Sequence, residues 1–172
     1  MGDNWSRKMK KSLKGILVSL GLVSAMQVQG GELPLDMALE AARAALAACQ
    51  KDGYKVTVAV LDFHGETKVL LKDDGSTIHT KDTAYRKAYT LVTLGPIFNL
   101  DTSSAAQKML SGKPSEPGFL TIPNVAPLPG AVAIRKSGEL VGAVGVGGAP
   151  GGAKDEACAE QGVAAVKAKL NK

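Results

Sequence analysis

Two histidines, His64 and His79, are the residues of this sequence best suited to hold a metal ion or a haem iron. Imidazole is the commonest protein ligand for both. His64 falls in a predicted turn between two strands, and His79 comes just before a predicted helix. Each also has an ordinary explanation, as a solvated turn residue or as packing at a helix start. A zinc site is poorly supported, because no cysteine or carboxylate accompanies the two histidines at a fixed spacing.

The glycine-rich segment from Gly147 to Gly152 is a second place where a ligand could bind. It begins like a dinucleotide-binding motif, but Pro150 stands at the last glycine position and no strand or acidic ribose-binding residue follows. What remains is the tendency of free backbone N–H groups at a helix start to favour anions. The alternative is a flexible strand-to-helix connection, and the acidic pair Asp155-Glu156 would itself partly satisfy that helix end.

Catalytic groupings are weak in this sequence. Asp73 and Asp74 are adjacent and more typical of a solvated loop, and no GxSxG motif is present. Lys87 is a candidate for a buried reactive amine, although such lysines more often pair or extend to solvent. An enzyme is therefore less favoured than a binding protein, and the question of enzymatic activity stays open.

The elements that must position these residues follow from hydrophobic periodicity. The order α-β-β-α-α-β-β-β-α predicts an α/β (α+β) domain whose sheet is largely antiparallel and covered by helices. Residues 112–129 are rich in proline and predict a long irregular excursion. The expected helices are 34–52, 80–94, a short one capped by Asp101 and ending at Ser111-Gly112, and 154–170; the expected strands are 56–63, 67–72, 119–122, 131–135 and 140–146.

Residues 1–30 read as a secretory signal peptide, because a basic start, a short apolar run and small residues near positions 25–30 follow one another. The apolar run is too short for a membrane span. We therefore expect a periplasmic or secreted protein with a single domain over residues 31–172. That domain carries sixteen basic and fifteen acidic residues, so the basic pI belongs to the leader and gives no evidence for nucleic-acid binding.

The two cysteines, Cys49 and Cys158, both fall at apolar positions of predicted helices. This favours two small buried thiols, while in an oxidising compartment the two would be able to pair. They form neither a CxxC nor a CxxCH motif, so a thioredoxin-type site and covalent c-type haem are unsupported.

Three segments carry a resemblance to a known family: Val58–Gly65 (VAVLDFHG), Asp74–Thr90 (DGSTIHTKDTAYRKAYT) and Glu139–Ala159 (ELVGAVGVGGAPGGAKDEACA). Together they resemble the GlcG/HbpS-like family of haem-binding proteins, over nearly all of residues 33–170. The resemblance implies a profilin-like three-layer sandwich with a five-stranded antiparallel sheet, and a homo-oligomer. Several members bind haem, and others accompany glycolate or cobalamin metabolism. Leu94-Gly95-Pro96 is less typical of the family.

The resemblance also implies a site. His79 and His64 stand at positions where haem-binding relatives often carry histidine. We expect His79 to be the main ligand of the haem iron, because a residue at a helix start is better fixed than one in a hairpin turn, and His64 to be the second, supplied by the same chain or by a neighbouring subunit. The other expected cofactor-binding residues are Tyr85, Arg86, Tyr89, Gly147, Gly148 and Gly151: the tyrosines as walls or a phenolate ligand, the rest toward the propionates.

The sequence therefore predicts an exported protein that stores, shuttles or senses haem, without stable membrane insertion once the leader is removed. The alternative is an enzyme, or an enzyme accessory, acting on a small glycolate-like acid. A structural oligomer with an incidental pocket is the third hypothesis.

Overall fold

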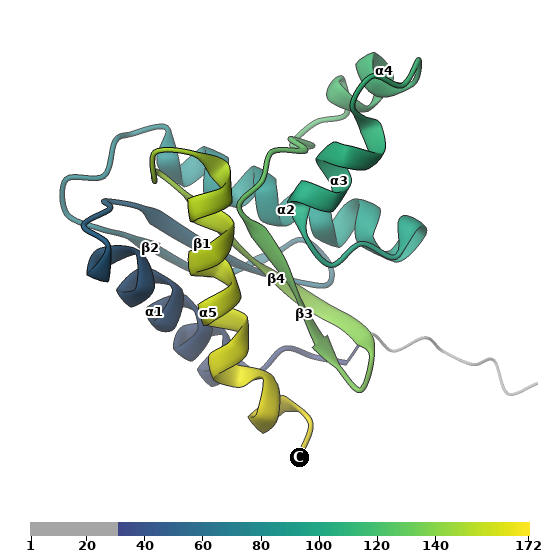
Figure 1. The fold of residues 1–172 in the computed structure, drawn as a ribbon. Helices are drawn as coiled ribbons and strands as arrows, with labels where there is room; N and C mark the ends of the chain where they lie inside the picture. Colours follow the sequence, from purple (N-terminus) through teal and green to yellow (C-terminus); the bar gives the residue numbers. More distant parts are fainter. Residues whose placement is uncertain (1–30) are drawn as a thin grey trace, which may run out of the picture.

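Strands rich in buried β-branched residues form a four-stranded antiparallel sheet at the centre of residues 31–172, which the computed structural model describes (Figure 1). The strands β1 (Thr57–Asp62), β2 (Thr67–Lys72), β3 (Ala131–Lys136) and β4 (Glu139–Gly147) lie in the order β2-β1-β4-β3. Both expected hairpins, β1–β2 and β3–β4, are present. The predicted signal peptide lies outside the described residues.

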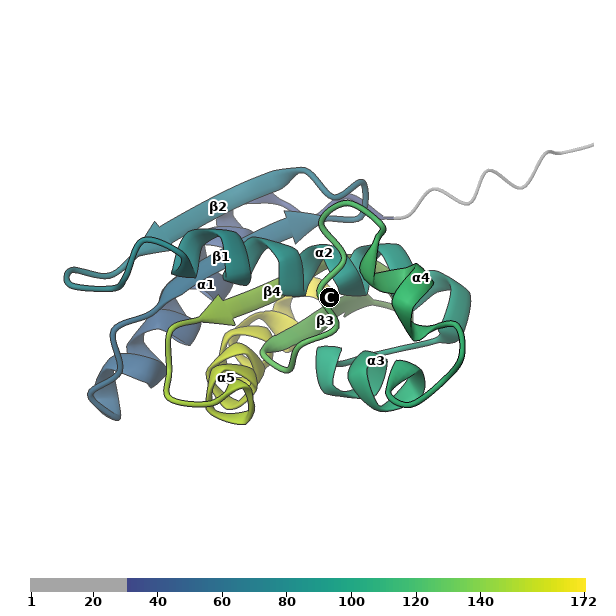
Figure 2. The same cartoon turned by 90° about the horizontal axis from the view of Figure 1, so that it is seen from above.

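Helices cover both faces of the sheet, as the sequence predicted (Figures 1 and 2). Helix α1 (Leu35–Lys51) and helix α5 (Gly152–Leu170) lie side by side on one face. Alanines of α1 and Val166 of α5 pack there on the valines of the strands. Helix α2 (Thr80–Phe98) packs on the other face through Ala84, Ala88 and Leu91. Within residues 31–172, no helix combines the length and the hydropathy that crossing a bilayer requires.

The expectation of a fifth strand at 119–122 is wrong, because Phe119 and Leu120 belong to a one-turn helix, α4 (Glu116–Leu120), and residues 121–122 form the turn after it. Pro117 in the first turn of α4 suits a helix start rather than a strand interior. The outer edge of β3 is partly occupied as well: Thr102 forms an isolated bridge with Val132, and the amide of Ala133 donates to the carbonyl of Asp101 at 2.9 Å. The edge of β3 therefore carries one isolated bridge in place of the fifth strand that the family resemblance implied.

Two helix boundaries differ from the expected ones. Helix α2 continues through Gly95-Pro96 to Phe98, and it ends where Asn99 adopts a left-handed conformation with φ of 52°. Proline removes one backbone donor near that end, and the helix tolerates the loss for one further turn. Helix α3 (Ser103–Leu110) is capped by Thr102, whose Oγ1 accepts from the amide of Ala105 at 3.1 Å; Asp101 instead pairs with Arg135 at 2.6 Å.

Glycines of β4 bring α2 unusually close to the sheet. A β-carbon at Gly145 would collide with the carbonyl oxygen of Ala84, and one at Gly147 would collide with Oγ1 of Thr83. Glycine at these positions lets the helix backbone approach where any side chain would push it away. The position of α2, which carries Tyr85, Arg86 and Tyr89 and follows His79, is therefore set by the sheet.

A disulfide between Cys49 and Cys158 joins α1 to α5. The Cα atoms are 5.5 Å apart, and both residues are buried in the core between the helices. The expectation of two free buried thiols is wrong, and the alternative of a pair is confirmed. Both cysteines lie on buried faces of their helices, and these faces meet where α1 contacts α5.

Candidate functional site

His79 stands at the start of α2 and is exposed. Its Nδ1 lies 3.2 Å from Oγ1 of Thr77, two residues earlier. A hydrogen bond at one ring nitrogen orients an imidazole and leaves the other nitrogen, Nε2, available to a ligand. The residue beside it, Ile78, is 75% exposed. An oriented imidazole and an uncovered apolar side chain therefore lie next to each other at this end of the helix.

His64 lies in the turn between β1 and β2 and is also exposed. Its amide donates to Oδ1 of Asp62 at 2.9 Å, and its ring meets the ring of Phe63 edge-on at 5.7 Å between centroids. The next residue, Gly65, lies against the middle of α2: a β-carbon there would be 3.2 Å from Cε2 of Tyr89. The turn that carries His64 is thus docked on Tyr89 of α2.

The two histidines lie near different parts of α2, His79 at its start and His64 beside its middle, and they do not meet. His79 precedes the helix, whereas the turn carrying His64 contacts it at Tyr89. Ten helical residues separate these points along the chain, which corresponds to about 15 Å along the helix axis. Within one chain, the structure therefore does not bring His64 and His79 to a common point.

Tyr85 and Tyr89 lie one turn apart on this part of α2, with ring centroids 5.6 Å apart. The pKa of Tyr85 is raised above its ordinary value, first by burial and then by the nearby Tyr89 and Glu66. A raised pKa keeps the phenol protonated at neutral pH, which disfavours a phenolate ligand. The tyrosine pair is better suited to form an aromatic wall.

The sheet surface beside this tyrosine pair is incompletely covered. In the register of the β1–β2 hairpin, Leu70 lies opposite Ala59, which packs on the α2 side of the sheet. Leu70 is nevertheless 47% exposed. Lys72 shares that face of β2 by the two-residue alternation of a strand, and Lys68 stands two residues before Leu70, at an irregularity in the β1–β2 register. The α2 side of β2 therefore offers an exposed apolar side chain between two lysines.

Arg86 is directed elsewhere. Its Nη2 donates to the carbonyl of Val125 at 3.3 Å, and the side chain lines a separate pocket beside residues 125–128. The structure thus places Arg86 apart from the turn that contacts Tyr89.

The glycine-rich segment is largely committed to packing and to a carboxylate of the chain itself. Gly147 lies against α2, Gly148 lies against the start of α2 and the two residues before β1, and Gly151 caps α5 with a φ of 118°. The amide of Ala149 donates to Oδ1 of Asp155 at 2.9 Å. The carboxylate of Asp155 therefore takes part of the place that the sequence predicted for a bound anion at this helix start. The sequence had suggested only that the acidic pair would partly satisfy the helix end.

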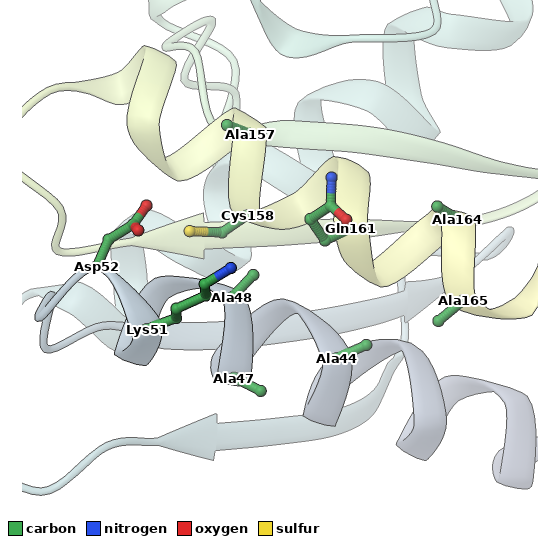
Figure 3. A pocket seen from close by; sticks show the side chains of 10 residues that line it. All are labelled: Ala44, Ala47, Ala48, Lys51, Asp52, Ala157, Cys158, Gln161, Ala164 and Ala165. Atoms are coloured by element: carbon green, nitrogen blue, oxygen red, sulfur yellow. The ribbon is translucent and has the colours of Figure 1, made fainter.

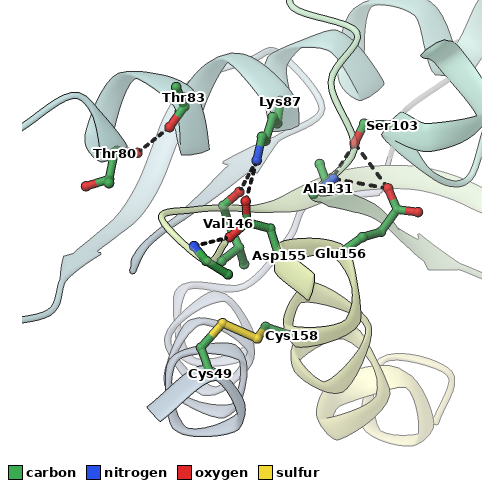
Figure 4. A network of polar contacts seen from close by, with 12 residues as sticks. Cys49, Thr80, Thr83, Lys87, Ser103, Ala131, Val146, Asp155, Glu156 and Cys158 are labelled. Atoms are coloured by element: carbon green, nitrogen blue, oxygen red, sulfur yellow. Dashed lines mark hydrogen bonds and ion pairs between the residues drawn. A yellow bond between two sulfur atoms is a disulfide. The ribbon is translucent and has the colours of Figure 1, made fainter. Parts of the chain in front are cut away.

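Lys87 and Asp155 form a buried ion pair that the sequence had not identified (Figure 4). Nζ of Lys87 lies 2.6 Å from Oδ2 of Asp155 and donates to the carbonyl of Val146 at 3.0 Å. The two residues are 5% and 3% exposed. Burial raises the pKa of Asp155, and Lys87 and the loop amides lower it again in part. The pair ties α2, β4 and α5 together rather than presenting a free amine.

Glu156 satisfies a second set of buried polar groups beside the pair. Its Oε2 accepts from the amides of Ser104 and Gly130 at 3.0 and 3.1 Å. Ser103, also bonded to Glu156, accepts in turn from the amide of Ala131 (Figure 4). In the sequence Asp155 and Glu156 are ordinary acids of a first helical turn, so nothing local indicated that both are buried.

One cavity of the structure lies away from the predicted site residues. It has a volume of about 800 Å³, lies between α1 and α5 and is lined mainly by alanines, with Cys158 and Gln161 (Figure 3). It contains none of the predicted site residues. Among residues 31–172 no group of three or more His, Cys, Asp or Glu side chains is arranged to hold a metal ion.

Comparisons with known proteins agree with this fold. HbpS has 37% identity to the chain, with a TM-score of 0.71 over 81% of this chain and 93% of HbpS. A double mutant of Streptomyces reticuli HbpS has 38% identity and a TM-score of 0.71, over 78% of this chain and 86% of the mutant. A haem complex of PduOC, at 21% identity and a TM-score of 0.69 over 78% of this chain and 95% of PduOC, shares the fold. No curated protein matches the sequence significantly.

A family model described as "Haem degrading protein HbpS-like" matches residues 33–164, which include the β1–β2 turn, α2 and the glycine-rich segment. The match covers most of the chain and agrees with the identity to HbpS. The chain belongs to the HbpS-like family.

Proposed function

We propose that this protein binds haem on the side of α2 that faces β2, with His79 as the ligand of the iron. The observation that carries the proposal is the oriented imidazole of His79 beside the exposed Ile78. The family match and the fold shared with a PduOC haem complex support it.

The residues on this side fit the chemical needs of haem. The disc requires apolar and aromatic walls, which Ile78, Leu70 and the Tyr85–Tyr89 pair would provide. The propionates require cations, which Lys68 and Lys72, on either side of Leu70 in β2, would supply. Bound haem would contribute an iron for storage, sensing or redox chemistry, and the chain would hold and orient it.

His64 enters this proposal as a ligand from a second copy of the chain. It is too far along α2 from His79 to share an iron within one chain, so two imidazoles on one haem would require a homo-oligomer. Size-exclusion chromatography with light scattering, with and without haem, tests this part.

The experiment for the main proposal is a spectral titration of haem into residues 31–172, carried out on the wild type, His79→Ala, His64→Ala and the double variant. Haem binding should give a Soret band that His79→Ala shifts or abolishes. Thr77→Val, which removes the partner of Nδ1, should weaken the band less. Arg86→Gln serves as a control that should leave it unchanged.

Wild-type spectra for both histidine variants would mean that the iron is held elsewhere or that haem is not the ligand. In that case the small-acid hypothesis becomes the better one, and turnover of 2-hydroxy acids should be assayed. Haem degradation, named in the description of the family, requires haem binding first and therefore depends on the same titration.

A further inference from the structure

A second pocket, of about 340 Å³, lies between α2, α3, α4 and residues 125–128. Its volume is at the lower end of the range for small-molecule sites. The proline-rich excursion that the sequence singled out forms much of its wall. Its lining includes Arg86, Glu116, Leu120, Val125, Pro127 and Leu128.

The wall of this pocket is fixed to α2 by two hydrogen bonds. Arg86 donates to the carbonyl of Val125 at 3.3 Å. The amide of Ala126 donates to Oγ1 of Thr90 at 2.8 Å. Because consecutive residues of the excursion are held by one helix, the pocket is formed before any ligand arrives, which lowers the entropic cost of binding.

Two opposite charges line the pocket without neutralising each other. Neither Arg86 nor Glu116 forms an ion pair with any residue in the range 31–172. Oε2 of Glu116 accepts from the amide of Gly112 at 2.8 Å, and no bond involves Oε1. The guanidinium of Arg86 retains donors beyond its single bond to Val125. Each charge can therefore accept a partner of opposite sign.

The apolar part of the lining is also incompletely covered. Leu120 is 52% exposed and Leu128 is 47% exposed, although both lie at the pocket. A ligand with an apolar side chain would cover them. A simple carboxylic acid would leave Glu116 without a partner, and a simple amine would do the same to Arg86.

We propose that this pocket binds a free amino acid with an apolar side chain. The carboxylate of the ligand pairs with Arg86, its ammonium group pairs with Glu116, and its side chain packs on Leu120 and Leu128. An Arg–carboxylate pair and a charge-assisted ammonium–carboxylate bond are both strong directional contacts. The site is independent of the haem proposal made above, which gives Arg86 no role: the sequence analysis expected Arg86 near the propionates, but its side chain is bonded to Val125.

Isothermal titration calorimetry with L-leucine, on residues 31–172 with the disulfide intact and no haem, tests the proposal. Leucine should bind saturably. Isocaproate, which lacks the ammonium group, and isoamylamine, which lacks the carboxylate, should each bind at least about tenfold more weakly, as expected for the loss of one charge-assisted bond. Arg86→Gln and Glu116→Gln should weaken leucine binding to the same extent.

Lys113→Gln is the matched control, because Lys113 is an exposed charge on the same excursion but does not line the pocket; it should bind leucine as the wild type does. A thermal melt shows whether each variant is folded, and Arg86→Lys, which keeps the charge, should retain part of the affinity. Absence of leucine binding by the wild type, equal affinity for isocaproate, or wild-type affinity in Arg86→Gln and Glu116→Gln would each overturn the proposal.

Discussion

At the scale of single residues, the Lys87–Asp155 pair shows how α2 is held at its depth in the molecule. Two charges buried beside the backbone of Val146 are tolerated only because each has the other and further hydrogen bonds. Removing one partner leaves an uncompensated charge, whereas replacing both with apolar groups does not.

Asp155→Asn should therefore lower the free energy of unfolding at neutral pH by about 3–5 kcal/mol. The double variant Lys87→Met with Asp155→Leu should lower it by much less. Urea denaturation of the two variants and the wild type measures the difference. Equal losses in the two would show that the ion pair is not the reason for the destabilisation.

The pH dependence of the free energy of unfolding gives a second test of the role of Asp155. Its pKa in the folded state is raised above the ordinary value of 3.8, so folding favours the protonated form. The stability this contributes is fully present below pH 3.8 and is lost as the pH rises through the raised pKa. Asp155→Asn should remove this slope from the stability profile in the acid range.

At the scale of elements, inward-facing periodicity predicted α1, α5 and both hairpins, because each of these elements buries one regular face. Helix 34–52 and the observed Leu35–Lys51 differ by one residue at each end. The pattern failed where local chemistry competes with tertiary packing. Pro96 suggested that the second long helix ends before it, but α2 continues past this proline. Phe119–Ile122 had the composition of a strand, but Thr102 already forms a bridge with the edge of β3.

Val166 and Val163 test how well the faces of α5 were predicted. Both valines are apolar residues of the helix expected over 154–170; Val166 is fully buried in the core, whereas Val163 is half-buried at a groove beside β3. Val166→Asp should destabilise the fold by several kcal/mol, since it buries an unpaired carboxylate. Val163→Asp should cost clearly less, because its carboxylate can reach water. Thermal unfolding compares the two, and equal losses would contradict the assigned faces.

The candidate site was predictable in its residue types but not in its arrangement. The position of His79 at a helix start and of His64 in a turn could be read from local patterns, and both are confirmed. That the β1–β2 turn docks near Tyr89, or that Arg86 turns toward Val125, depends on packing between segments far apart in the chain. Such contacts leave no periodic signal in the sequence.

At the scale of the whole molecule, we propose that the chain is exported as a single domain that begins near residue 31. The Cys49–Cys158 disulfide supports this, because such bonds persist in oxidising compartments. Expression of the full chain in a host with a periplasm, followed by N-terminal sequencing of the periplasmic fraction, should give a start between Met26 and Glu32. Recovery of periplasmic protein that begins at Met1 would refute it.

Removing the disulfide should weaken the whole domain. The bond spans 109 positions of sequence, and closing so long a loop restricts the unfolded chain strongly. The double variant Cys49→Ser with Cys158→Ser should lose about 2–5 kcal/mol of stability. A reductant should lower the melting temperature of the wild type and leave that of the variant unchanged.

The same bond also makes most of the domain a covalent ring. The β1–β2 turn, α2 and the exposed excursion at 111–124 all lie between the two cysteines, so one break in the excursion opens the ring without dividing the molecule. The fragment carrying His79 would remain attached to the fragment carrying α5. A protease that cleaves there would yield one band on a non-reducing gel and two after reduction, and the nicked domain would keep its helices tethered face to face.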